Sequence, residues 1–135
     1  VLFSTDGSKR EITQKIEKTL IQSFKFDSEL IKVLVLSKSD VKTVIDQARK
    51  GFGSQPEKYH TDVVFLIGVS AQAAFTETEC HPEVDKAWLG NNVIYYQRLS
   101  EKRTKSRLAK VVGKPVYKSM TIRTFNTVKR IYERL

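Results

Sequence analysis

Residues 84–97 read VDKAWLGNNVIYYQ, and this stretch decides the fold class. Two runs of strand length, 84–89 and 93–97, flank Gly90-Asn91-Asn92. Gly and Asn favour tight hairpin turns, so the pattern predicts two antiparallel strands. Two further apolar runs, Leu30 to Leu36 and Asp62 to Ile67, predict central strands of the same kind of sheet.

Helical segments alternate with these strands. Capping boxes, Ser8 with Glu11 and Ser37 with Asp40, indicate two helix starts, and Gly51 lies where we expect the second helix to have its C-cap. Apolar residues repeat at helical spacing after the first box, and we expect their side of the helix to face the core. These residues are Ile12, Ile16, Leu20 and Phe24.

This alternation, with one clear hairpin, indicates an α+β protein with a ferredoxin-like arrangement of helices on one face of a sheet. We expect two small ferredoxin-like α/β lobes, residues 1–50 and 51–135, with the boundary in the loop Gly51 to Tyr59 and a cut as early as Ser37 as the alternative. The chain opens on a predicted strand, Val1 to Phe3, without an initiator Met. The first lobe is therefore expected to be incomplete at its N-terminus, so that residues 1–50 are a remnant of it.

Composition narrows the class of protein further. The longest apolar stretch, Val63 to Val69, has seven residues, whereas a membrane span needs about 20. We therefore expect no membrane partner. A single cysteine, Cys80, excludes an internal disulfide framework and fits a reducing cytoplasm. The oligomeric state is not determined by these features.

The positive charge is concentrated at the C-terminal end. The chain has a formal net charge of +9, and residues 98–135 hold twelve Lys or Arg against two acids, a net of +10. The other residues are close to neutral. A concentrated positive field attracts anions, so nucleic acid or a phosphorylated small molecule is the first class of partner to test.

The bases of this tail lie at two expected helix starts. A helix predicted from Thr104 to Val112 has three bases around its first turn, where the helix dipole disfavours each cation by about 0.3–1 kcal/mol. A bound anion would relieve that cost, and Arg123 to Thr127 repeat the pattern before the final helix. If the two starts converge, the anion-binding residues are Lys105, Ser106, Arg107, Arg123, Thr124 and Asn126. The alternative, which charge runs generally favour, is a set of solvated bases on two helix ends.

Aromatic residues interleave with the tail bases, which admits two interpretations. They could stack on nucleobases, or they could form core, and apolar periodicity favours core. The residues are Tyr95, Tyr96, Tyr117, Phe125 and Tyr132.

Enzyme signals are weak. Gly68-Val69-Ser70-Ala71 approximates a nucleophile elbow but lacks the final Gly, so we expect Ser70 to be a helix N-cap. Cys80 and His81 are adjacent and make a poor chelate, so no metal site is expected. The neighbouring acids are best explained as a solvated helix end: Glu77, Glu79 and Glu83. No catalytic residue and no cofactor is expected, and whether the protein is an enzyme stays open.

The tail also resembles a known family. Tyr95, Lys105-Ser106-Arg107-Leu108 and residues 120–128, MTIRTFNTV, resemble the C-terminal signature of the bacterial family catalogued as domain of unknown function 1697. The family pattern is approximately Ser-Lys-Leu on one helix and Thr-x-Arg-Asn-Trp-Asn-Thr-Val before the last. Here Thr124 stands for the Asn and Phe125 for the Trp.

Upstream, three segments are similar to family strands and a turn: 1–4, 24–27 and 63–66. The resemblance therefore covers essentially the whole chain, and it implies two α+β lobes. Family members begin earlier, with a segment rich in Arg-Gly-Ile-Asn-Val-Gly, and the family has no established biochemistry.

Three hypotheses for function follow. The first is a non-enzymatic domain that binds nucleic acid or a phosphorylated ligand at the basic helix ends, with binding sensitive to salt and to Lys105→Ala or Arg123→Ala. The second is an enzyme acting on a small anionic metabolite, with its site completed by the missing N-terminal segment. The third is a structural or protein-interaction domain.

Overall fold

A computed structural model of the chain describes residues 1–25 and 31–135. It contains a four-stranded antiparallel sheet in the order β2-β3-β1-β4. The strands are β1 (Tyr59–Leu66), β2 (Asp85–Leu89), β3 (Val93–Leu99) and β4 (Met120–Thr124). The mixture of helices and an antiparallel sheet confirms the α+β class, whereas the ferredoxin-like form of each lobe stays a prediction.

The predicted hairpin is the β2–β3 pair, in which Leu89 lies opposite Ile94. Asn92 at its turn has a φ of 57°, the left-handed conformation that Asn tolerates. Gly90 is also required, because a Cβ there would lie 2.6 Å from the Tyr95 ring. The predicted strand from Asp62 is the greater part of β1.

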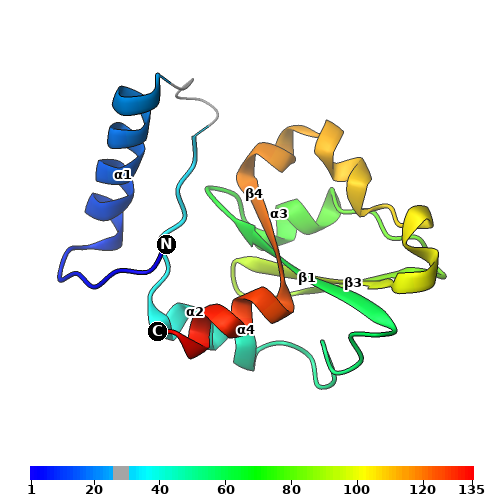
Figure 1. The fold of residues 1–135 in the computed structure, drawn as a ribbon. Helices are drawn as coiled ribbons and strands as arrows, with labels where there is room; N and C mark the ends of the chain where they lie inside the picture. Colours follow the sequence, from blue (N-terminus) through cyan, green and yellow to red (C-terminus); the bar gives the residue numbers. More distant parts are fainter. Residues whose placement is uncertain (26–30) are drawn as a thin grey trace.

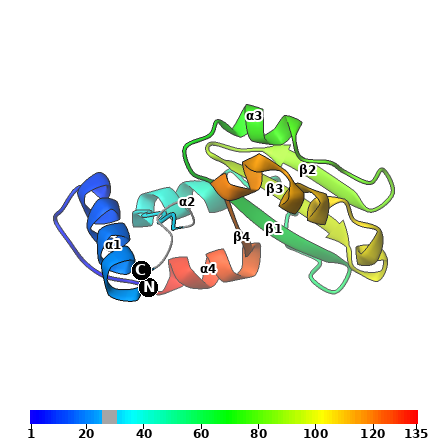
Figure 2. The ribbon, with the colours of Figure 1, turned by 90° about the horizontal axis from the view of Figure 1, so that it is seen from above.

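Helices cover both faces of the sheet (Figures 1 and 2). On one face, α2 (Lys38–Asp46) and α4 (Phe125–Glu133) pack over a core that includes Val63 and Tyr95. On the other face, α3 (Ala71–Thr76) and three short 3-10 segments accompany a smaller core around Ile94. The expectation of helices on one face alone is corrected, because alternate residues of the central strands are apolar on both sides.

The N-terminal part differs from the prediction. α1 (Lys9–Phe24) has its expected capping box, but none of its residues is fully buried: Ile12, Ile16 and Leu20 of the apolar stripe are half-buried and belong to neither buried core cluster. Figure 1 shows this helix standing apart from the sheet. Val1 to Phe3 and residues 31–36 are not strands, and Leu30 lies outside the described residues. Leu34 and Leu36 instead pack against the core under α2 and α4, which satisfies their apolar character without sheet pairing.

The tail differs as well. Instead of one helix from Thr104, it forms 3-10 segments η1 (Ser100–Lys105), η2 (Leu108–Gly113) and η3 (Pro115–Ser119), followed by β4. The helix is interrupted at Ser106, which has extended backbone angles. The next N–H, that of Arg107, donates to the Asp85 carboxylate rather than to a helical carbonyl.

The predicted lobe boundary lies in the loop after α2. α2 ends at Asp46 with Gln47 as its C-cap, so Gly51 is a loop residue with a φ of 84° and not the expected cap. Val41 and Val44 of α2 pack in the same core as the sheet residues. The division into residues 1–50 and 51–135 stays a prediction, and α2 packs with the second part.

Candidate anion-binding groove

The first half of the predicted anion site already holds an anion of the protein itself. The backbone N–H groups of His81 and Arg107 each donate to Oδ2 of Asp85 over 2.8 Å, and Oδ1 of this buried carboxylate has no hydrogen-bond partner among the described residues. Asp85 is only 4% exposed. Burial raises its pKa, but the backbone N–H groups of Arg107 and His81, with the nearby Ser106 and Tyr96 hydroxyls, outweigh burial and lower the pKa below its ordinary value. One of the expected cradle's donors, the N–H of Arg107, is therefore occupied.

The second half lies elsewhere in the sheet. Asp85 belongs to β2 and Arg123 to β4, which are the two edge strands on opposite sides of the sheet. Thr124 caps α4 by accepting the N–H of Thr127, and Asn126 follows in the first turn of that helix. The structure therefore does not bring Lys105, Ser106 and Arg107 together with Arg123, Thr124 and Asn126. Whether any of the six binds an anion stays a prediction.

A groove runs beside β4 instead. It consists of two adjoining hollows of about 710 Å³ and 330 Å³, which share Lys32, Ile67 and Thr121. The first is closed by η2, η3 and the residues between them, and the second by α4 and residues 34–36. We call these two hollows together the β4 groove.

The β4 groove presents cations without acidic side chains. Lys118 lines the first hollow, Arg123 the second, and Lys32 both, and no Asp or Glu among the described residues lines either. Lys118 and Arg123 have no ion pair within the described ranges, and the Lys32 ammonium donates to the Ser119 hydroxyl over 3.4 Å. The positive field of these side chains is therefore not cancelled locally.

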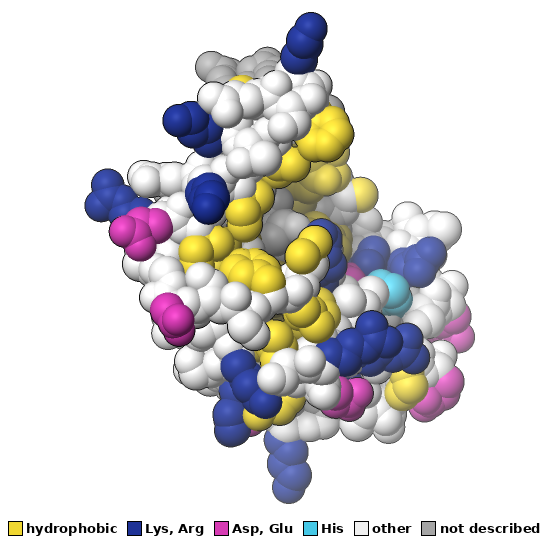
Figure 3. Space-filling model, turned by 60° about the vertical axis from the view of Figure 1, so that its left-hand side comes forward, with side chains coloured by type: hydrophobic (Ala, Val, Ile, Leu, Met, Phe, Trp, Pro, Cys, Tyr) yellow, Lys and Arg dark blue, Asp and Glu magenta, His cyan; other side chains and the backbone are white. Residues whose placement is uncertain are grey.

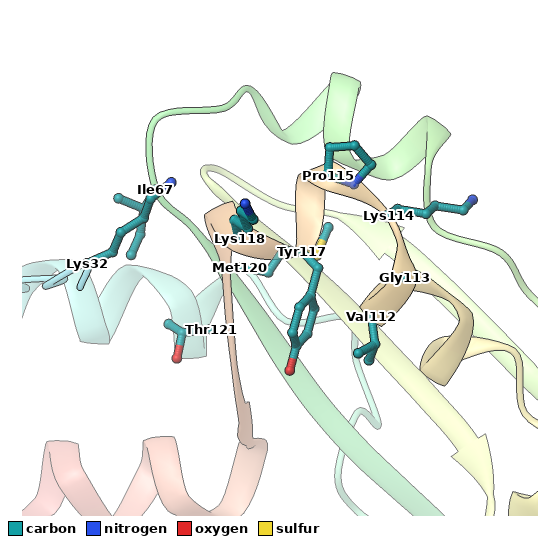
Figure 4. Close-up of a pocket in the computed structure, with 10 residues that line it drawn as sticks. All are labelled: Lys32, Ile67, Val112, Gly113, Lys114, Pro115, Tyr117, Lys118, Met120 and Thr121. Atoms are coloured by element: carbon teal, nitrogen blue, oxygen red, sulfur yellow. The ribbon is translucent and has the colours of Figure 1, made fainter. Parts of the chain in front are cut away.

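One further lysine of the groove is neutralised. The Nζ atom of Lys114 donates to the Glu77 carbonyl over 2.7 Å and lies 3.3 Å from a carboxylate oxygen of Glu79. Figure 4 shows its side chain extending away from those of Lys32 and Lys118. Lys114 therefore links the η2–η3 corner to the end of α3 and is not available to bind a ligand.

The walls of the β4 groove are apolar. Val112 is 55% exposed and Tyr117 is 38% exposed, so both leave apolar surface accessible to a ligand. Figure 3 shows hydrophobic side chains running down the middle of one face of the molecule, with Lys and Arg beside them. Apolar walls next to unpaired cations suit an anion that carries an apolar portion.

The outer edge of β4 adds a backbone donor. The carbonyl of Ser119 accepts the N–H of Ile67, so alternate residues of this strand bond to β1. By the alternation of an antiparallel ladder, the N–H of Ile122 points away from the sheet, whereas the N–H of Met120 donates to the carbonyl of Tyr117. The carbonyl of Ile122 accepts a bond from the Arg123 guanidinium, over 2.7 Å, which holds that cation at the open edge.

A second charged cluster is structural. Asp62, 2% exposed, lies 2.5 Å from Nη2 of Arg98 and 3.2 Å from Nε2 of His60. The pair bridges β1 and β3 and satisfies a carboxylate that would otherwise be buried alone. Within residues 1–25 and 31–135, no group of three or more His, Cys, Asp or Glu could hold a metal.

The catalytic interpretation of Ser70 gains no support. Its hydroxyl accepts the N–H of Ala73 and caps α3, as expected.

Of the tail aromatics, Tyr95, Tyr96 and Phe125 are buried, which confirms the core interpretation for these three. Tyr117 is the exception, since it lines the β4 groove.

Sequence reasoning missed most of the groove. It identified Arg123 but placed it at a helix start, and it did not single out Lys32 or Lys118 as ligand-binding residues. One signal was available: Met120 and Ile122 alternate with polar residues at the period of two that indicates a strand. No pattern shows that residue 32 approaches residues 118–121, because that contact is tertiary.

Comparisons with known proteins bear on the fold. The model of a family described as "Protein of unknown function (DUF1697)" matches residues 1–95 and ends before the tail motif at 120–128. The conserved bacterial protein SP0830 from Streptococcus pneumoniae has a similar structure, with a TM-score of 0.72 and 19% sequence identity over 97% of this chain and 72% of that one. At that identity the likeness concerns the fold alone. No curated protein matches the chain. No helix within the described ranges is both long and apolar enough to cross a membrane.

Proposed function

The chain belongs to the DUF1697 family, whose description assigns no function, and we propose that it is a non-enzymatic domain that binds a phosphorylated small molecule in the β4 groove. The observation that carries the proposal is the lining of the groove. Its described residues include three cations without an ion pair, Lys32, Lys118 and Arg123, and no acidic side chain. The groove would supply what a phosphate group needs when it leaves water: opposite charge, hydrogen-bond donors and partial shelter from solvent.

The size of the groove favours a small molecule over a polynucleotide. The larger hollow, about 710 Å³, falls within the range of about 300–1,000 Å³ that is usual for small-molecule sites. Val112, Tyr117 and Ile67 would contact the apolar part of the ligand, while Lys118 and Lys32 would contact its phosphate. A ligand with both parts should therefore bind more tightly than inorganic phosphate.

The proposal is tested with 1-naphthyl phosphate, which joins an aromatic group to a phosphate. Isothermal titration calorimetry would compare it with inorganic phosphate and with 1-naphthol. We expect 1-naphthyl phosphate to bind most tightly, since only this probe uses both the cations and the apolar wall. Equal affinity for all three probes, or binding of 1-naphthol alone, would contradict a phosphate site.

The position of the site is tested with a pair of charge-matched variants. Lys32→Ala with Lys118→Ala removes two cations from the groove, whereas Lys102→Ala with Lys105→Ala removes two exposed cations from η1. We expect about a tenfold loss of affinity in the first variant, because exposed ion pairs contribute about 0.2–1 kcal/mol each. The second variant should bind as the unmodified protein does. An equal loss in both would assign binding to the general positive field.

A further inference from the structure

A second cleft, distant in the sheet from the β4 groove, combines aromatic rings with unpaired cations. It lies over β2 and the neighbouring end of β3, has a volume of about 310 Å³, and is lined by residues of the loop after α2 and of three strands. Its charged and aromatic residues are Arg49, Lys50, Phe52, Tyr59, Lys86 and Trp88. We call it the Trp88 cleft.

The rings of the Trp88 cleft are positioned by the sheet. Trp88 lies opposite the buried Tyr95 in the β2–β3 pair, so its side chain projects from the face that α2 covers. Phe52 packs edge-on against the Trp88 indole, with ring centroids 6.0 Å apart. The indole is thereby held in place while remaining only half-buried.

The cations of the cleft have no acidic partner. Arg49, Lys50 and Lys86 form no ion pair within the part of the chain that the structure describes. No Asp or Glu of that part lines the cleft. The guanidinium of Arg49 lies 5.4 Å from the centroid of the Trp88 ring, so one cation is already attached to the aromatic surface.

From this arrangement we infer that the Trp88 cleft binds a nucleotide unit, with its base stacked on Trp88 and its phosphate held by Arg49, Lys50 and Lys86. An aromatic platform beside cations is the combination with which proteins hold unpaired bases. A base on the indole takes the place of the Arg49 guanidinium, which then turns to the phosphate. The amide side chains of Gln55 and Gln97, which also line the cleft, supply donors and acceptors for the edge of the base.

The cleft provides its own spectroscopic probe, because Trp88 is the single tryptophan of the protein. The test titrates the protein with ATP, with a ten-residue oligothymidylate and with ribose 5-phosphate, which has a phosphate but no base. The inference predicts quenching of Trp88 fluorescence by ATP or the oligonucleotide and none by ribose 5-phosphate. Quenching by ATP identifies a free nucleotide as a sufficient ligand, and quenching by the oligonucleotide alone identifies a single strand.

Variants decide whether the binding belongs to this cleft. Arg49→Ala and Lys86→Ala should each weaken binding about fivefold, as expected for exposed charge pairs. Trp88→Leu should weaken binding of a fluorescein-labelled oligothymidylate about 5- to 150-fold in fluorescence anisotropy, the range expected when one base loses its stacking partner. Circular dichroism would establish whether each variant is folded. If Trp88→Leu does not fold, the two charge variants still test the inference.

The β4 groove serves as the internal control. Lys32→Ala with Lys118→Ala should leave the quenching by nucleotides unchanged. No quenching by any base-containing probe, or quenching that is lost only in the groove variant, would overturn the Trp88 cleft and leave the proposed function of the groove intact. Quenching that persists in the groove variant, together with failure of 1-naphthyl phosphate to bind, would support the cleft and refute the proposed function.

Discussion

The backbone nitrogen of Arg107 donates to Oδ2 of Asp85 over 2.8 Å, although the two residues are 22 positions apart. This bond ties the break between η1 and η2 to the edge strand β2. It also uses a donor that an external anion would need. The protein's own carboxylate thus takes the place that a ligand was expected to hold.

Asp85→Asn should destabilise the fold in a pH-dependent way. The folded-state pKa of Asp85 lies below its ordinary value of 3.8, so the carboxylate stabilises the fold above that pH. Its contribution is lost as the pH falls through the lowered folded-state pKa. We expect a loss of about 1–3 kcal/mol in the free energy of unfolding at pH 7, which shrinks toward zero below that pKa. Urea unfolding across this pH range measures it.

A matched control separates this effect from general charge removal. Glu57→Gln replaces an exposed acid and should change stability little at any pH. If Asp85→Asn has the same small effect at pH 7, the bond to Arg107 contributes nothing measurable.

The Asp62–Arg98 pair should behave as a coupled unit. Arg98→Ala leaves Asp62 buried with only His60 nearby among its described ionic partners, and removing one partner of a buried pair costs about 3–5 kcal/mol. Asp62→Ala with Arg98→Ala should cost less than the sum of the single changes. A double-mutant cycle in urea gives the coupling energy, and strict additivity would show that the two side chains do not interact.

Gly53→Ala should be destabilising for two separable reasons. Its φ is +74°, and a Cβ would lie 2.7 Å from the Phe125 ring. Backbone strain of this kind costs about 1–3 kcal/mol, and displacement of a buried ring adds to that cost. Thermal unfolding measures the total.

Substitutions at two other glycines separate backbone strain from the contact with Phe125. Gly68 has a φ of +71°, and a Cβ at this position would meet no described atom within 4 Å. Gly113 has neither a positive φ nor a near contact of that kind. Gly68→Ala should therefore report strain alone, and Gly113→Ala should be close to neutral. A Gly53→Ala variant no less stable than Gly68→Ala would refute the contact with Phe125.

Arg123→Ala should weaken binding of 1-naphthyl phosphate up to about fivefold, whereas Lys105→Ala should not. Arg123 lines the β4 groove, but Lys105 does not. Raising the salt concentration should reduce the difference between unmodified protein and Arg123→Ala, because counterions screen exposed charges. Equal sensitivity to both substitutions would place the anion outside the groove.

Local patterns were sufficient for much of the fold. The turn residues Gly90 to Asn92 specify the β2–β3 hairpin, and Ser8, Ser37 and Ser70 mark the starts of α1, α2 and α3. These features depend on neighbours within a few positions, so a sequence contains all the information that they need. The same holds for the α+β class.

Only the tertiary structure decided which cations face a ligand. Residues 31–36 have the composition of a strand, yet they lie outside the sheet and bring Lys32 to the β4 groove. The helix expected at Thr104 is interrupted because Asp85 competes for the N–H of Arg107, and the cluster of bases is divided between opposite edges of the sheet. Each outcome depends on a partner far away in the chain. Composition therefore determined that the protein is basic, whereas strand order and long-range hydrogen bonds determined where its unpaired charges lie.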